Sequence, residues 1–123
     1  MMKRRLSVIL ALTLSILISS CSNKVDGVKV IGAEALLRWS CPEFGLLGAD
    51  QIVPILEESG LIAPVGRWIL IKTFTQCKMW NEYNKRFHMS VNLSYMQFER
   101  SDIVLDVQMA LEKSGVNPEN VIL

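Results

Sequence analysis

Two stretches decide the fold: GAEALLRW at residues 32–39 and FHMSVNL at residues 87–93. Residues 28–36 and 87–93 alternate or run apolar, as strands with one covered face do. Between them, the apolar residues of 64–83 recur at steps of three and four, which predicts a helix with one buried face. The order strand, helix, strand is typical of βα units around a parallel sheet.

Further elements extend this pattern. Proline and glycine in residues 41–48 predict a loop. A helix capped by Asp50 is expected through Ser59, and Gly60 would end it. Another helix is expected over 103–114, and a third strand begins at Val121. The whole arrangement predicts an α/β fold.

The N-terminal residues resemble an export signal. Residues 3–5 are Lys-Arg-Arg, and an apolar run follows over 6–18. A bilayer span takes about 20 apolar residues, so this run is too short to cross comfortably. The ending Ile18-Ser19-Ser20-Cys21 resembles the lipobox of bacterial lipoproteins, which implies a lipid on Cys21. The alternatives are an uncleaved anchor and a chance apolar leader created by a truncated reading frame.

Two segments follow from this interpretation. Residues 1–21 are predicted to be a signal peptide that forms an apolar helix, and residues 22–123 a separate domain. A working signal would make the protein a membrane-anchored lipoprotein. Without it, the protein would be cytoplasmic or associated with the inner membrane.

Composition narrows the class of protein. Half of the residues are apolar and the formal net charge is +1, so a modest core is possible. The N-terminal basic cluster leaves no basic patch elsewhere that would indicate binding to a nucleic acid polymer. Cys41 and Cys77 are interpreted as two buried free thiols, with a disulfide as the alternative. Glu57 and Glu58 are interpreted as a solvated helix end.

Polar residues stand near the ends of the first two predicted strands. Alternation places Glu34 and Asn92 where both side chains can point to a shared interior. Working groups of βα folds lie at such strand ends. A carboxylate and an amide oxygen are hard ligands suited to Mg²⁺ or Mn²⁺. Two ligands do not make a site, and from spacing alone each is more simply a polar residue that ends a strand.

Several spaced motifs resemble the EAL-domain family of cyclic di-GMP phosphodiesterases. Residues 34–39 read EALLRW, residues 58–62 read ESGLI where the family has ETGLI, and residues 90–94 with Gln97 and Phe98 match VNLS..QF. The motifs follow the family's order over about residues 25–123. Further matches are Pro42, Gly45, Ile52, Pro54, Gly66, Trp68, Leu70, Gln76 and Trp80.

The resemblance implies both a fold and a site. The fold would be a fragment of a (β/α)₈ barrel, comprising about its first two to three βα units. Glu34 and Asn92 would be metal ligands, Leu36 would line the pocket and Arg38 would reach a phosphate of cyclic di-GMP. Family members use two divalent ions, Mg²⁺ or Mn²⁺, to open one phosphodiester bond and release linear pGpG.

Departures from the family pattern limit what the resemblance implies. Cys41 stands where the family usually has His, Ala49 replaces a usual Pro, and the later acidic motifs have no counterpart here. We therefore predict a truncated EAL-domain protein that is inactive as this chain. One alternative is a membrane-anchored lipoprotein whose EAL-like module binds a protein or a nucleotide without catalysis. Another is a split enzyme that a second chain completes.

Overall fold

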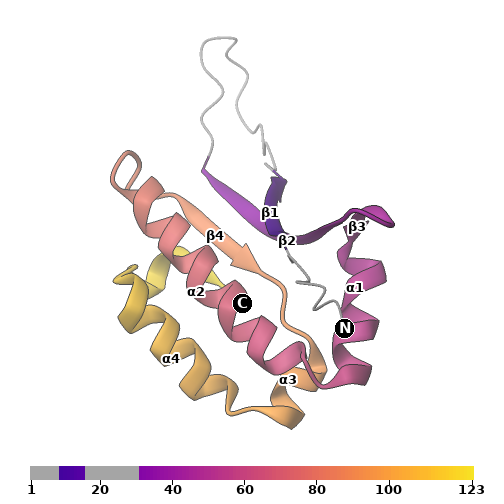
Figure 1. Cartoon of the computed structure of the whole chain (residues 1–123). Coiled ribbons are helices and arrows are strands. Elements are labelled where there is room, and N and C mark those ends of the chain that lie inside the picture. The colour runs from indigo at the N-terminus through magenta and orange to yellow at the C-terminus, as the bar shows by residue number, and fades with distance from the viewer. Residues whose placement is uncertain (1–8, 16–30) are drawn as a thin grey trace, which may run out of the picture.

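The structure is a computed structural model that describes residues 9–15 and 31–123. Its strands form one sheet, and α2 and α4 pack together beside it (Figure 1). In chain order the elements are β1 (Ile9–Ser15), β2 (Gly32–Cys41), β3 (Gly45–Gly48), α1 (Ala49–Ser59), α2 (Ile62–Asn81), β4 (His88–Val91), α3 (Tyr95–Arg100), α4 (Ile103–Ser114), a short 3₁₀ helix (Pro118–Asn120) and β5 (Val121–Ile122).

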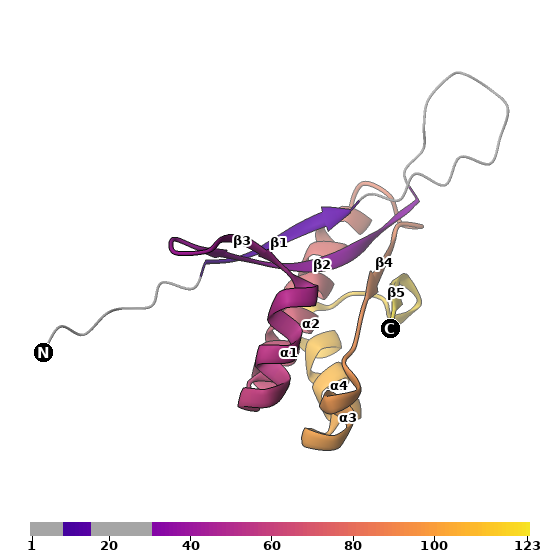
Figure 2. The ribbon, with the colours of Figure 1, turned by 90° about the vertical axis from the view of Figure 1, so that its right-hand side faces the viewer.

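The sheet mixes parallel and antiparallel pairs. Its order is β1-β2-β4-β5, with β3 also paired to β2. The pairs β2 with β4 and β4 with β5 are parallel, and in the first pair Glu34 lies opposite Ser90. A parallel connection needs a crossover, which α1 and α2 supply between β2 and β4 (Figure 2). The predicted α/β order is therefore confirmed.

The predicted N-terminal apolar helix is wrong over residues 9–15. These residues form β1, which runs antiparallel to β2 with Ile9 opposite Ser40 and Ser15 opposite Glu34. An apolar run that holds isoleucine, leucine and threonine suits a strand as well as a helix, and β2 offers an edge whose backbone groups need partners. The lipobox with Cys21 lies outside the described residues. No helix in the described ranges is long and apolar enough to cross a membrane.

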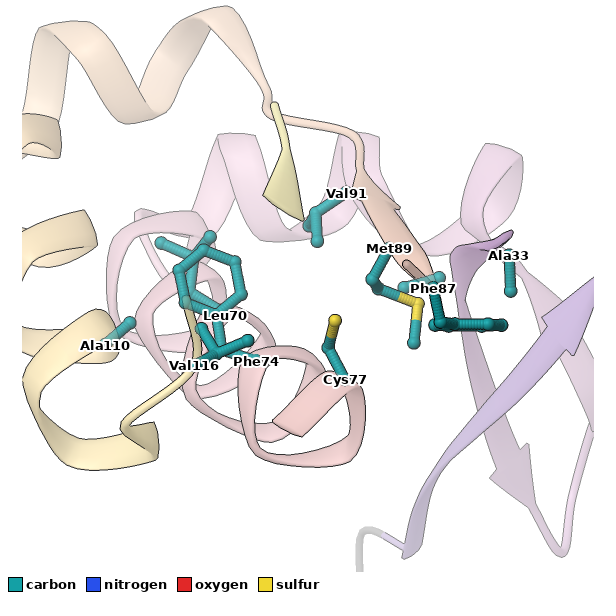
Figure 3. Packing of buried hydrophobic residues seen from close by; sticks show 10 residues of the cluster. Ala33, Leu70, Phe74, Cys77, Phe87, Met89, Val91, Ala110 and Val116 are labelled. Atoms are coloured by element: carbon teal, nitrogen blue, oxygen red, sulfur yellow. The ribbon is translucent and has the colours of Figure 1, made fainter. Parts of the chain in front are cut away.

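A hydrophobic core lies between the sheet and the helices α2 and α4 (Figure 3). Leu70, Phe74 and Cys77 follow one face of α2 at steps of four and three, and all three are fully buried. Met89 of β4 and Ala110 of α4 are equally buried. The periodicity that predicted the α2 helix thus marks the face that meets the sheet.

The two cysteines of the described residues differ in burial. Both Cys41 and Cys77 are free thiols. Cys77 is buried as predicted, whereas the prediction is wrong for Cys41, which is only partly buried. Cys41 is the last residue of β2 and lies opposite Gly45, next to the turn into β3.

The elements β3 and α3 were also not predicted. Residues 41–48 are not one loop, because β2 runs to Cys41 and pairs there with β3, whose first residue Gly45 has φ +72°. A left-handed residue is what glycine permits in so tight a hairpin. The second is α3, which follows Ser94: the Ser94 side chain accepts a hydrogen bond from the Met96 N–H, and Gln97 reaches back to the Ser94 N–H.

Candidate functional site

The two faces of β2 differ in burial. Ala33, Ala35 and Leu37 are buried, whereas Glu34, Leu36 and Arg38 alternate with them and are half-buried. Side chains of a strand alternate between its faces, so the second set shares the face away from the core. The predicted candidate residues of β2 therefore lie together on the open face.

The register brings Asn92 to the same face. Ser90 of β4 lies opposite Glu34, and Asn92 follows Ser90 by two residues, just past the end of the strand. The Asn92 Nδ2 donates a hydrogen bond of 2.6 Å to the Glu34 Oε1. Residues 58 positions apart in the chain thus place an amide and a carboxylate in direct contact.

This pair suits two corners of a hard-cation site. The Glu34 carboxylate offers oxygen. The Asn92 amide offers oxygen if it flips about its last side-chain torsion, which is possible because the two ends of an amide are nearly isosteric. Mg²⁺ takes six oxygen ligands, usually including water. Across the described residues no three His, Cys, Asp or Glu side chains gather as a metal cluster. Glu34 and Asn92 thus fit as two ligands, and the remaining ligands would come from water or other groups.

Arg38 and Leu36 continue the open face along β2. Leu36 lies between Glu34 and Arg38 on this face, because every second residue of a strand points the same way. The Arg38 Nη1 donates a hydrogen bond of 2.8 Å to the Leu37 carbonyl. The guanidinium has further N–H groups with which to bind a phosphate in a forked geometry. The structure places the Arg38 guanidinium and the Glu34 carboxylate on one face, separated along the strand.

Glu57 was missed as a residue connected to this site. The interpretation as a solvated helix end is wrong for Glu57, because its carboxylate accepts a hydrogen bond from the Ser94 hydroxyl. Glu57 lies in the last turn of α1, and Ser94 follows Asn92 by two residues. The capping-box pattern Ser94-x-x-Gln97 indicates the start of α3 but does not point to Glu57.

An apolar pocket of about 570 Å³ adjoins Asn92. Its walls include Leu93, Phe98, Val104 and Val107 from the loop after β4 and from α3 and α4. Among the described residues that line it, none has an acidic or basic side chain. The polar chemistry of this region therefore rests on the open face of the sheet.

Comparison with known proteins decides the family. Residues 23–123 match the family described as the EAL domain. The chain belongs to the EAL domain family. One relative is MucR of Pseudomonas aeruginosa, a bifunctional diguanylate cyclase/cyclic di-GMP phosphodiesterase, which is 37% identical over 95 residues. Another is the cyclic di-GMP phosphodiesterase PdeR of Escherichia coli, which is 33% identical over 85 residues.

The chain spans only a small part of these EAL relatives. The MucR match covers 76% of this chain but 14% of MucR, and the PdeR match covers 69% of this chain and 13% of PdeR. The chain is thus a partial EAL domain.

Solved EAL structures share the fold. The PaMucR phosphodiesterase in its c-di-GMP complex superposes with a TM-score of 0.75 and 30% identity, over 94% of this chain and 44% of that chain. The EAL enzyme Bd1971, bound to cAMP and cyclic di-GMP, superposes with a TM-score of 0.66 and 30% identity, over 78% of this chain and 28% of that chain. The predicted relation to the barrel of EAL domains is confirmed.

Proposed function

We propose that this EAL unit contributes one side of a cyclic di-GMP phosphodiesterase site. In it, Glu34 and Asn92 are ligands of Mg²⁺ or Mn²⁺, Leu36 lines the nucleotide pocket and Arg38 binds a phosphate. The contact of 2.6 Å between the Asn92 amide and the Glu34 carboxylate carries this proposal. The likeness to a phosphodiesterase solved with c-di-GMP supports the choice of ligand.

The residues present have separate tasks. Glu34 supplies negative charge to hold a cation, and Asn92 supplies a neutral oxygen that helps to fix the cation's position. Arg38 offsets phosphate charge through its guanidinium fork. A bound divalent ion would supply an acidified water and stabilise developing charge on the phosphoryl group.

The 123-residue polypeptide is expected to bind a cation weakly and not to hydrolyse cyclic di-GMP. Two protein ligands from Glu34 and Asn92 fall short of the set that family members use for two ions. Incubation with cyclic di-GMP and Mg²⁺ or Mn²⁺, followed by chromatography, should reveal no pGpG. Formation of pGpG that Glu34→Gln abolishes would overturn this expectation.

Cation binding has its own test. Mn²⁺ added to the ¹⁵N-labelled chain should broaden the NMR signals of Glu34 and Asn92, since a paramagnetic ion relaxes nearby nuclei. Glu34→Gln should remove this broadening. Glu43→Gln, which deletes the same charge at an exposed turn residue, should leave it unchanged. Broadening that is the same in both variants would show that the ion binds elsewhere.

We further propose the lipoprotein interpretation of the N-terminus as an alternative setting for this module, with a lipid on Cys21 that anchors the protein to a membrane. It is supported by the order of charged, apolar and small residues that ends at Cys21. Cleavage before Cys21 would remove β1, so lipid attachment and β1 pairing exclude one another. Palmitate labelling in bacteria should disappear in Cys21→Ala, and labelling that persists would refute the lipid on Cys21.

A further inference from the structure

Asn92 lies in a short coil that the sheet does not hold. β4 ends at Val91 and α3 begins at Tyr95, so residues 92–94 lie beyond the last ladder pair of β2 with β4, Ala35 with Val91. A side chain in such a coil keeps its direction only if contacts around the coil fix the backbone. The approach of Asn92 to Glu34 therefore depends on what anchors this coil.

Ser94 is the anchor at the far end of the coil. Its hydroxyl accepts the Met96 N–H at 3.1 Å, and its backbone N–H donates to the Gln97 side-chain oxygen at 2.9 Å. The same hydroxyl donates its proton to the Glu57 carboxylate of α1. A hydroxyl that donates and accepts at once has a fixed orientation, which joins the coil to both α1 and α3.

A second contact holds α3 against α2. Gln97 is buried, and it lies so close to Gly66 that a Cβ built there would collide with the Gln97 Nε2. The coil that carries Asn92 is thus tied to α1 through Glu57 and, one turn later, to α2 through Gln97. Of these two contacts, only the one from Glu57 involves a charged group, and its partner Ser94 is two residues from Asn92.

We propose that Glu57 is a positioning residue that holds the 92–94 coil, through Ser94, so that the Asn92 amide points at Glu34. This role rests on the proposed function, since it matters for catalysis only if Asn92 serves as a ligand. Partners behind a ligand orient it, and their loss typically lowers metal affinity about 10–100-fold. Glu57 acts through Ser94 and Asn92 and touches neither the ion nor the nucleotide.

Three variants of the full ¹⁵N-labelled chain separate this role from general stability. Glu57→Ala removes the acceptor of the Ser94 hydroxyl, and Glu57→Gln keeps an acceptor oxygen while it removes the charge. Glu58→Ala deletes a carboxylate at the neighbouring exposed residue and serves as the matched control. Thermal unfolding of each variant shows how much stability changes.

The first measurement is the NMR signal pair of the Asn92 side-chain amide without metal. The two Asn92 amide protons should differ strongly in chemical shift in the unmodified chain, because one of them is hydrogen-bonded to the Glu34 carboxylate. In Glu57→Ala they should move toward the values of a free amide, and in Glu57→Gln and Glu58→Ala they should stay. Unchanged Asn92 signals in Glu57→Ala, or an equal change in Glu58→Ala, would overturn the proposal.

A second variant and a second measurement complete the test. If Glu57→Ala does not fold, Ser94→Ala removes the same hydrogen bond from the other side, Ser94→Thr restores a hydroxyl, and the Asn92 signals must move in the first and return in the second. In a folded Glu57→Ala variant, the affinity for Mn²⁺ measured by titration should be about tenfold lower than in the unmodified chain. If the unmodified chain binds no Mn²⁺ while the Asn92 signals behave as expected, the proposed function fails and the positioning role stands.

Discussion

The two faces of the sheet are built from alternate residues of the same strands but differ in what covers them. On one face, Leu37 and Met89 are buried, and Met89 belongs to the core between the sheet and the helices. On the other, Glu34 and Arg38 of β2 are half-exposed, and Asn92 is exposed in the coil past β4. The buried face gives stability through apolar contact, whereas the open face carries groups whose chemistry needs access to ligands. Substitutions on the two faces should therefore have separable effects.

The largest expected difference comes from two adjacent leucines. Leu37 is buried, and its truncation leaves a cavity, so Leu37→Ala should cost about 2–5 kcal/mol of unfolding free energy. Leu36 is half-buried on the open face, so Leu36→Ala should cost about 1 kcal/mol or less. Urea unfolding followed by circular dichroism measures both. Equal losses would show that the two faces are covered alike.

A smaller effect is expected where α3 meets α2. Gly66→Ala should cost about 1–3 kcal/mol, since the new methyl group would collide with the buried Gln97 side chain. In Gln97→Ala the obstacle is gone, so Gly66→Ala should cost less in that background. A double-mutant cycle from urea unfolding should give a coupling of at least about 0.5 kcal/mol. Strict additivity would contradict the close approach.

The cap of α4 tests the helix layer behind the buried face. The Asp102 carboxylate accepts the Leu105 N–H at 3.1 Å. Asp102→Ala should therefore lower stability by about 1 kcal/mol, whereas Asp102→Asn keeps a good capping oxygen and should change it little. Differential scanning calorimetry of the two variants measures the shift in Tm. A drop of the same size in both would assign the effect to charge.

The smallest effect at neutral pH belongs to Cys77, a free buried thiol of α2. Burial raises the pKa of Cys77 from 9.0 to about 11, and a backbone hydrogen bond involving Met89 opposes that rise. Well below the unfolded pKa of 9.0 both states keep the proton, and stability does not depend on this group. As pH rises from 9.0 toward about 11 the unfolded chain loses a proton that the folded chain retains, so stability falls.

Two variants isolate this pH dependence. Cys77→Ala should flatten the fall in stability above pH 9.0 relative to the unmodified chain, and Cys41→Ala, which removes the other free thiol of the described residues, is the control. Urea unfolding at neutral pH, near the unfolded pKa and about one pH unit above it would measure the slopes. Identical slopes in all three proteins would mean that Cys77 ionises equally in both states.

Sequence patterns predicted the longer elements and the residues of the candidate site. The helix 103–114 agrees with α4, and alternation correctly placed Glu34 and Asn92 on one side of the sheet. Both predictions succeed because period and strand-end position are local properties of the chain. The metal and nucleotide roles of these residues stay predictions.

The missed features depend on pairing partners that a local sequence pattern does not show. The few residues of β3 are too short a run to show a period, and they become a strand only because β2 is there to pair with them. The apolar run that contains β1 fits a helix by composition. Nothing in that run shows that it pairs with the edge of β2. Glu57 looked like any charged residue at a helix end, because its bond to Ser94 spans 37 positions.

One consequence of the β2 pairing concerns the order in which parts of the molecule open. β1 lies along residues 34–40 on one edge of β2, while β4 and β3 hold residues 32–35 and 38–41. A backbone held from several sides is among the last to give up its amide protons to solvent, whereas short coils open at low free energy. Local opening of the native state should therefore move the Asn92 amide while the backbone that carries the Glu34 carboxylate stays paired.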